Sequence, residues 1–186
     1  TNLTPAILAY DGIRFKYMAP EVFSYKEFEY IQNHLFILSG FYGAVRPFDG
    51  VIPYRLEMQA KLQGENFKNL YDFWRGDIAK YITDGRDTVI NLASDEYFKA
   101  VKKYFPENIR VVTCVFADLE NGKLKEKGVK CKMARGEIVR YMAENNVQSP
   151  EELKKFQRQG YAYRDDLSSD DRFVFVQKKI CENHRF

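Results

Sequence analysis

Cysteine and histidine are both scarce in this chain. Its 186 residues include three cysteines, Cys114, Cys131 and Cys181, and two histidines, His34 and His184. The cysteines are far apart and form no CxxC pair, which indicates a reducing compartment and hence the cytoplasm. So few histidines and such dispersed cysteines predict no tightly bound transition metal, and nothing in the sequence predicts another cofactor.

Long apolar runs and a leader-like start are also lacking. No apolar run approaches the roughly 20 residues that span a bilayer, so no membrane association is predicted. The opening stretch, TNLTPAILAYDGIRF, has neither a basic head nor a long apolar core, so no signal peptide is expected. The composition, 45% hydrophobic and 16% aromatic, is that of a folded domain rather than a disordered chain.

Positive charge is concentrated in one part of the chain. The net charge is +3, but residues 99–140 hold 11 basic and 5 acidic side chains, whereas residues 1–98 hold 10 basic and 13 acidic ones. Such a block can face the phosphates of a nucleic acid, although a solvated lysine face is the simpler alternative. Charge alone therefore leaves nucleic-acid binding open.

Periodicity and capping residues predict a mixture of helices and strands. Ser24 with Glu27 and Ser149 with Glu152 have the spacing of capping boxes, and each pair precedes an expected helix. Asn121-Gly122 is typical of a two-residue hairpin turn. The expected helices are near 5–11, 24–35, 67–82, 94–104, 132–145 and 149–156, and the expected strands near 35–38, 87–94, 109–117, 123–131 and 172–177.

These elements indicate an α+β fold in a single domain over residues 1–186. We expect a central mixed sheet, flanking helices, a β-hairpin near 109–131 and a helix-turn-helix near 132–157 that borders a basic cleft. On the returning hairpin strand, Cys131 would be at most a diagonal neighbour of Cys114. That geometry is poor for a disulfide and favours two buried thiols.

The stretch from Leu38 to Met58, LSGFYGAVRPFDGVIPYRLEM, combines glycines, prolines, arginines, tyrosines and acids without helical or strand periodicity. Arginine presents a planar fork to phosphate or carboxylate, and tyrosine can stack on an unpaired base. An irregular crossover tied by internal salt bridges is the structural alternative, and we rank it slightly lower. The residues expected at an anion or nucleic-acid site here are Ser39, Tyr42, Arg46, Tyr54 and Arg55, with Glu57 as a candidate acid or base.

Two further stretches carry polar residues in suggestive places. In NLASDEYF, Asn91 ends a strand and Ser94 opens a helix, where free N–H groups attract anions, although plain capping is the simpler role for Ser94. In KCKMARGEIVRY, basic residues lie along an expected helix. The glycine inside that helix suggests close packing or close approach to a ligand. The candidates from these stretches are Asn91, Glu96 and Tyr97, then Lys132, Arg135 and Arg140.

Together and in this order, the three stretches resemble the YaaA family. The family pattern is approximately S-G-L-Y-G-x-L-R-P-x-D-x-I-x-P-Y-R-L-E-M, then N-L-A-S-x-E-Y, K-x-A-R-G, a G-Y and a strand like F-V-F. Here these read SGFYGAVRPFDGVIPYRLEM, NLASDEYF, KMARG, QGYAY and RFVFVQ, with Phe41 and Gly50 as mild departures. The family usually begins with a strand of the type S-P-A-K-T, so this chain is expected to be its C-terminal three-quarters.

The resemblance implies a cytoplasmic bacterial protein linked to peroxide stress and to control of free iron. It also implies a positively charged cleft with affinity for double-stranded or distorted DNA, bound through phosphates. A helix-hairpin-helix is matched in outline only, because the turn NNVQS lacks the G-x-G of that motif.

Two other functions stay open. The rival is an enzyme on a phosphorylated or nucleotide-like small molecule, with Glu57 or Glu96 as acid or base. Direct iron sequestration ranks last, because two histidines cannot supply a two-His-one-carboxylate site. No protein partner is predicted.

Overall fold

The structure is a computed structural model that describes residues 2–178, so Cys181 and His184 lie outside the described residues. Its main sheet has the order β5-β6-β9-β8, with β7 paired to β6. Strands β5, β6 and β9 run parallel, while β7 and β8 are antiparallel to their neighbours. The bounds are β5 Thr88–Asn91, β6 Arg110–Glu120, β7 Lys123–Lys125, β8 Tyr161–Tyr163 and β9 Arg172–Gln177.

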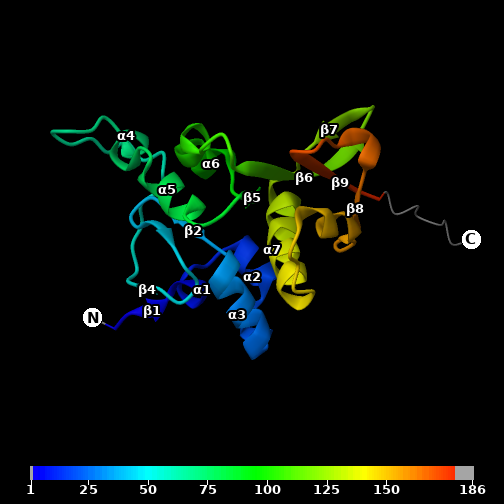
Figure 1. Cartoon of the computed structure of the whole chain (residues 1–186), viewed down its shortest axis with the longest axis horizontal. Coiled ribbons are helices and arrows are strands. Elements are labelled where there is room, and N and C mark those ends of the chain that lie inside the picture. Colours follow the sequence, from blue (N-terminus) through cyan, green and yellow to red (C-terminus); the bar gives the residue numbers. More distant parts are fainter. Residues whose placement is uncertain (1, 179–186) are drawn as a thin grey trace, which may run out of the picture.

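Most helices and two short ribbons lie below this sheet and to its left in Figure 1. The ribbons pair β1 with β4 and β2 with β3, and their bounds are β1 Thr4–Pro5, β2 Ile37–Ser39, β3 Gly43–Val45 and β4 Gly50–Val51. The α-helices are α1 Ala6–Ala9, α2 Ile13–Met18, α3 Tyr25–His34, α4 Leu70–Trp74, α5 Asp77–Thr83, α6 Asp95–Val101 and α7 Gly128–Glu144. The 3₁₀ helices are η1 Pro20–Val22, η2 Lys102–Tyr104, η3 Pro150–Lys155 and η4 Asp165–Leu167. No helix among the described residues is long and apolar enough to cross a membrane.

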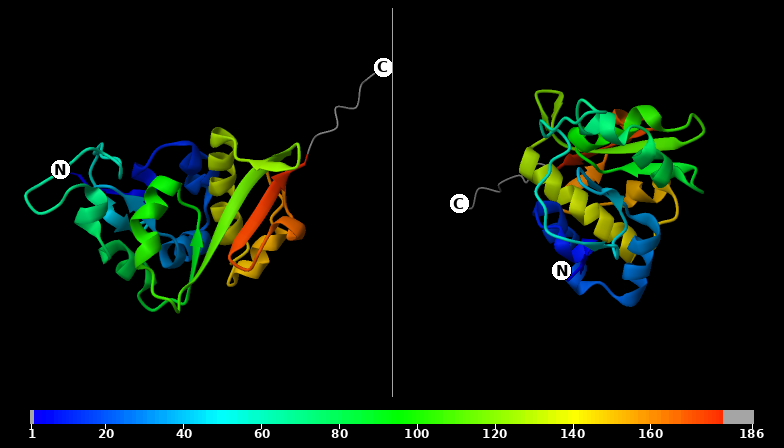
Figure 2. Two further views of the ribbon diagram at one scale, coloured as in Figure 1. Left: turned by 90° about the horizontal axis from the view of Figure 1, so that it is seen from above. Right: turned by 90° about the vertical axis from the view of Figure 1, so that its left-hand side faces the viewer.

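Helix α7 lies between the main sheet and the N-terminal helices, as the views in Figures 1 and 2 both show. One of its faces contributes Ala134 and Ile138 to the core under β6 and β9. The adjoining face contributes Val139 and Ala143 to a second core with α2 and α3. Full burial of a large aliphatic side chain is worth roughly 1.5–3 kcal/mol, so α7 binds the two halves of the fold together.

Local signals in the sequence are confirmed where they act over a few residues. The Ser24 N–H donates to Glu27 at 2.5 Å in the predicted capping box, and the Ser149 N–H donates to Glu152 at 2.9 Å in the other. The turn at Asn121-Gly122 is confirmed by the pairing of Glu120 with Lys123 and of Asp118 with Lys125. The mixed α+β class with a central sheet is confirmed as well.

Three element predictions are wrong in extent. The helix expected over 67–82 is divided at Arg75, whose φ of 44° ends α4 before α5 begins. The returning hairpin strand stops at Lys125, so Cys131 belongs to α7 rather than to a strand. The second helix of the expected helix-turn-helix is the short 3₁₀ helix η3. Each error arises because packing against another element, rather than local preference, decides the backbone.

The two described cysteines are free thiols in the core. Cys114 and Cys131 are buried in the same apolar cluster, and burial raises the pKa of Cys114 to about 12. Because burial keeps a reagent from both sulfurs, and the raised pKa of Cys114 further reduces its reactive thiolate form, we expect both to react with a thiol reagent at least about tenfold more slowly in the native protein than in denaturant. Mass-spectrometric mapping of alkylated peptides measures this at each site. Equal rates at Cys114 in the two states would show that the thiol is accessible.

Candidate functional site

The stretch 38–58 folds back on itself around Gly40. A Cβ at Gly40 would lie 2.7 Å from the Leu56 carbonyl oxygen, so only glycine lets these two backbone segments touch. The Gly40 carbonyl accepts the indole N–H of Trp74 at 3.0 Å. The Tyr42 hydroxyl accepts the Ile52 N–H at 3.1 Å. The segment that carries Tyr54 is thereby held against the turn between β2 and β3.

A chain of hydroxyl groups runs from this turn into α1 and α2. The fully buried Ser39 Oγ lies 2.5 Å from the Tyr54 hydroxyl, which lies 2.8 Å from the Tyr10 hydroxyl. The Tyr10 ring stacks on Phe15 at 5.7 Å. Burial, more than any other influence, raises the pKa of Tyr10 above its ordinary value. Tyr10 therefore stays protonated and able to donate throughout the physiological pH range.

Two arginines, Arg14 and Arg135, line the same cavity as Tyr10. Arg14 of α2 is partly buried, and its pKa is lowered first by that burial and then by the nearby charge of Arg135 from α7. The Arg135 side chain is only 12% exposed and donates to Glu126 at 3.2 Å. Its Nε atom is buried without a hydrogen-bond partner, and Arg14 makes no ion pair within residues 2–178. Such a pair of guanidinium groups favours an anion between or beside them.

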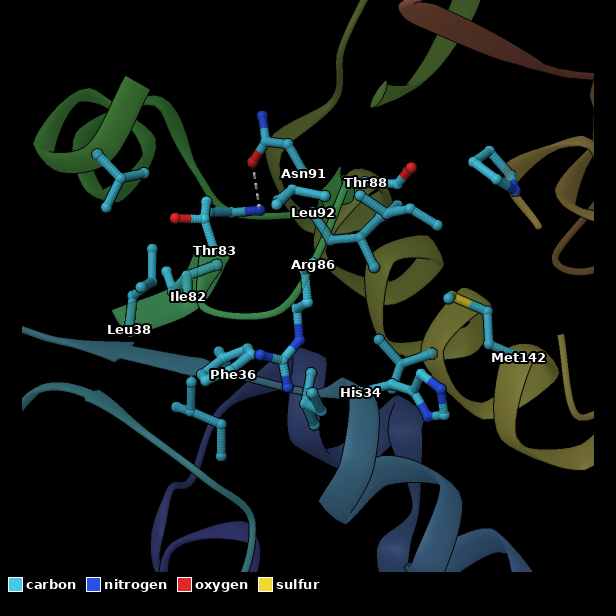
Figure 3. A pocket seen from close by; sticks show the side chains of 18 of the residues that line it. His34, Phe36, Leu38, Ile82, Thr83, Arg86, Thr88, Asn91, Leu92 and Met142 are labelled. Atoms are coloured by element: carbon cyan, nitrogen blue, oxygen red, sulfur yellow. Dashed lines mark hydrogen bonds between the residues drawn. The ribbon is translucent and has the colours of Figure 1, made fainter. Parts of the chain in front are cut away.

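The second predicted stretch lies beside the arginines. Asn91, at the carboxyl end of β5, accepts the Ala93 N–H at 3.0 Å and donates to Thr113 at 3.3 Å (Figure 3 shows the first bond). Tyr97 lies near enough to Arg14 to affect the pKa of Arg14. Burial and then the charge of Glu96 raise the pKa of Tyr97. One oxygen of Glu96 accepts the Gln59 N–H at 3.2 Å, which gives this carboxylate a structural partner.

These groups open on one large cavity of about 1160 Å³ between α2, α3, α7 and β5. Of the site residues predicted from sequence, Asn91, Tyr97 and Arg135 line it. Ser39 and Tyr54 lie behind this wall and reach it through Tyr10. Figure 3 shows Arg86, another lining residue, extending to the ring of Phe36, and the two are 4.8 Å apart. Most of the remaining lining is apolar.

The remaining predicted residues lie elsewhere. Arg46 donates to the Gln32 carbonyl at the end of α3 and packs over Phe36 at 4.7 Å, so it caps a helix C-terminus. Arg140 pairs with Glu144 at 2.7 Å. Arg55, Glu57 and Lys132 are exposed outside the cavity lining.

The basic block of residues 99–140 is largely compensated by nearby acids. Lys127 lies 2.6 Å from Asp118 and 3.0 Å from Glu120, and Lys125 lies 3.3 Å from Glu120. Exposed ion pairs contribute little to stability, but they reduce the charge that a phosphate would meet. The surface of the hairpin is therefore a weaker candidate anion site than the cavity.

Tyr10 and Arg14 were missed by sequence reasoning. They stand in a stretch, AYDGIRF, that matches no motif and was assigned only a short helix ending near Asp11. The available signal was Gly136, the glycine inside the basic helix. It marks where the backbone of α2 meets α7, and this contact sets Arg14 beside Arg135.

Comparison with known families agrees with the motif resemblance. Residues 1–167 match the family described as "Peroxide stress protein YaaA". The chain belongs to the YaaA family. The matched residues include the hydroxyl chain, Arg14, Arg135, Asn91 and Tyr97.

Relatives of the YaaA family member described here carry the name UPF0246 protein. One from Desulfitobacterium hafniense (strain Y51) is 55% identical over 174 residues, which are 94% of this chain and 69% of the relative. One from Agathobacter rectalis is 52% identical over 95% of this chain and 71% of the relative. One from Pediococcus pentosaceus is 51% identical over 96% and 71%.

Proposed function

We propose that this YaaA-family chain binds nucleic acid in the cytoplasm as part of the peroxide stress response. Phosphate oxygens would enter the cavity at Arg14 and Arg135, and binding would help to limit iron-dependent oxidative damage to DNA. The observation that supports this is the pair of adjacent guanidinium groups, of which Arg14 has no carboxylate partner among the described residues. In a site of reduced dielectric constant, such a pair attracts an anion more strongly than exposed lysines do.

Aromatic side chains near the hydroxyl chain suit an unpaired or distorted strand. Phe41 is 50% exposed and stacks on Tyr54 with ring centroids 5.3 Å apart. Tyr42 packs edge-on against Tyr54 at 5.5 Å. Stacking of a base on an exposed aromatic ring is worth about 1–3 kcal/mol and does not depend strongly on sequence. These rings would add a contact that is insensitive to salt.

A second candidate function is that of an enzyme on a phosphorylated or nucleotide-like small molecule. The observation that favours it is that the arginine pair lines a mostly apolar cavity of about 1160 Å³, because small-molecule sites are concave, mostly apolar and carry a few polar groups. Glu57 and Glu96 both raise the pKa of Tyr97 by their charge, so two carboxylates lie near the cavity wall. Either would be the acid or base of such an enzyme.

A salt titration with matched variants tests the main proposal. A labelled DNA duplex with an unpaired internal segment, and the same sequence fully paired, are titrated at several salt concentrations. We expect affinity to fall steeply with salt, because each neutralised phosphate releases counterions. Arg14→Gln should weaken binding by about tenfold and make the salt dependence shallower by about one contact. Arg164→Gln is the control, because it removes an equal charge from an exposed pair with Asp166 outside the cavity lining.

The outcomes separate the two functions. If neither DNA binds, or if Arg14→Gln and Arg164→Gln are equal, the nucleic-acid role of the cavity is wrong. Turnover of a phosphorylated compound that is abolished by Glu57→Gln or Glu96→Gln, with ligand binding retained, would favour the enzyme. On the main proposal, both glutamate variants bind DNA at least as well as wild type.

A further inference from the structure

The hydroxyl chain at Ser39 has a direction that follows from counting donors and acceptors. The Ser39 Oγ accepts the N–H groups of Phe41 at 3.1 Å and Tyr42 at 2.9 Å, which occupies both of its lone pairs. Its own hydrogen is therefore donated to the Tyr54 hydroxyl at 2.5 Å. The bond of 2.8 Å between Tyr54 and Tyr10 can run either way, and Tyr54 is its donor when a ligand accepts from Tyr10. In that arrangement the hydrogen of the Tyr10 hydroxyl is free at the end of the chain.

That hydrogen is available to a ligand in the cavity. Tyr10 belongs to the cavity lining, whereas Ser39 and Tyr54 do not. Arg14, Tyr97 and Arg135 line the same cavity, and Tyr97 and Arg135 are both close enough to Arg14 to affect the pKa of Arg14. We call Tyr10, Arg14, Tyr97 and Arg135 the donor cluster. Its two guanidinium groups only donate, and Tyr10 can donate to a ligand while it accepts from Tyr54.

Negative charge near the donor cluster is limited. Among the described residues that line the cavity, Asp87 is the only carboxylate, and it precedes β5, whose far end carries Asn91. Glu126 reaches Arg135 through one terminal nitrogen and leaves Nε unpaired. Glu57 and Glu96 lie near Tyr97, but Arg14 makes no ion pair among the described residues and the Nε of Arg135 has no acceptor.

We propose that the donor cluster binds a terminal phosphate, that is, a phosphate monoester at the end of a strand or on a nucleotide. This inference rests on the proposed function and specifies its ligand. A monoester carries about −1.5 to −2 charges and three free oxygens, which matches two guanidinium groups and a hydroxyl. A backbone diester has one charge and two free oxygens, and its strand must continue in two directions. The charge and the number of free oxygens therefore match the monoester better.

Oligonucleotides that differ only at their ends test this ligand. One single strand is prepared with a 5′-phosphate, a 3′-phosphate or hydroxyl ends, and each is titrated with wild type, Tyr10→Phe and Tyr25→Phe. We expect one terminal phosphate to tighten binding at least about tenfold, as charge-assisted hydrogen bonds in a buried site do. Tyr10→Phe keeps the ring and should reduce that gain to about threefold or less. Tyr25 is 83% exposed, and Tyr25→Phe should keep the full gain.

Inorganic phosphate and a nucleoside 5′-monophosphate serve as competitors. Both should displace the phosphate-ended strand and leave residual binding close to that of the hydroxyl-ended strand. Equal affinity for all three ends, with salt-dependent binding retained, would refute the terminal-phosphate site and leave the proposed function standing. Binding of the monophosphate but of no oligonucleotide would refute nucleic-acid binding and support the assigned ligand class. Failure of every phosphate compound to bind would refute both.

Discussion

Gly136→Ala should destabilise the protein by about 2–3 kcal/mol, although alanine is the better helix former. In an exposed helix the same change would stabilise by about 1 kcal/mol. Here a Cβ would overlap the carbonyl oxygen of Arg14 and lie 2.9 Å from the backbone nitrogen of Met18. Both obstacles are backbone atoms of α2, so the strain cannot be relieved by rotating a side chain. Helices α2 and α7 must separate, and Arg14 must move relative to Arg135.

The matched control is Gly128→Ala at the start of the same helix. A Cβ at Gly128 meets no atom within 4 Å, so this variant should be neutral or slightly more stable than wild type. Denaturant unfolding measures both variants, and the loss at Gly136 corresponds to a Tm lower by roughly 4–12 °C. If the two alanine variants have the same stability, the close contact between α2 and α7 is not present in solution. Ligand affinity should also fall for Gly136→Ala alone.

The same contact illustrates how far the sequence could predict the site. The internal glycine of the basic helix indicated either close packing or a ligand, and the structure shows close packing that also positions Arg14. Capping boxes and the hairpin turn were predictable because they depend on residues three or four positions apart. The pairing of α2 with α7 joins residues more than 100 positions apart, and no local pattern encodes it.

The arginines also show what the sequence could not predict. A sequence gives the charge of Arg46, Arg135 and Arg140 but not their partners. In the fold, Arg46 donates to a helix-end carbonyl, Arg140 pairs with a carboxylate one turn away, and Arg135 lines the cavity. Of the candidate site residues in the motif stretches, Asn91, Tyr97 and Arg135 line the cavity. Which side chain of each stretch faces the cavity depends on the packing of α3, β5 and α7.

Ser39→Ala should be the second large loss, at about 2–4 kcal/mol. The serine is fully buried, and its oxygen accepts two backbone N–H groups, from Phe41 and Tyr42. Alanine leaves both donors without an acceptor, and an unsatisfied buried group costs about 1–3 kcal/mol. Ser94→Ala is the matched control, because Ser94 caps α6 without a side-chain hydrogen bond. Ser94→Ala should lower the free energy of unfolding by no more than about 0.5 kcal/mol.

Tyr54→Phe distinguishes the stability of the turn from the direction of the hydroxyl chain. It leaves Ser39 able to accept both N–H groups, so most of the stability should remain, but it removes the donor to Tyr10. Without that donor Tyr10 is free to rotate its hydrogen away from the cavity, and preference for a phosphate-ended strand should fall as it does for Tyr10→Phe. If Tyr54→Phe lowers the free energy of unfolding as much as Ser39→Ala does, the hydrogen bond of Ser39 that matters most for stability is the one to Tyr54, not those to the backbone. If Ser39→Ala and Ser94→Ala are equally stable, the Ser39 oxygen does not accept the two backbone N–H groups in solution. Its lone pairs would then be free, and there would be no reason to assign its hydrogen to Tyr54.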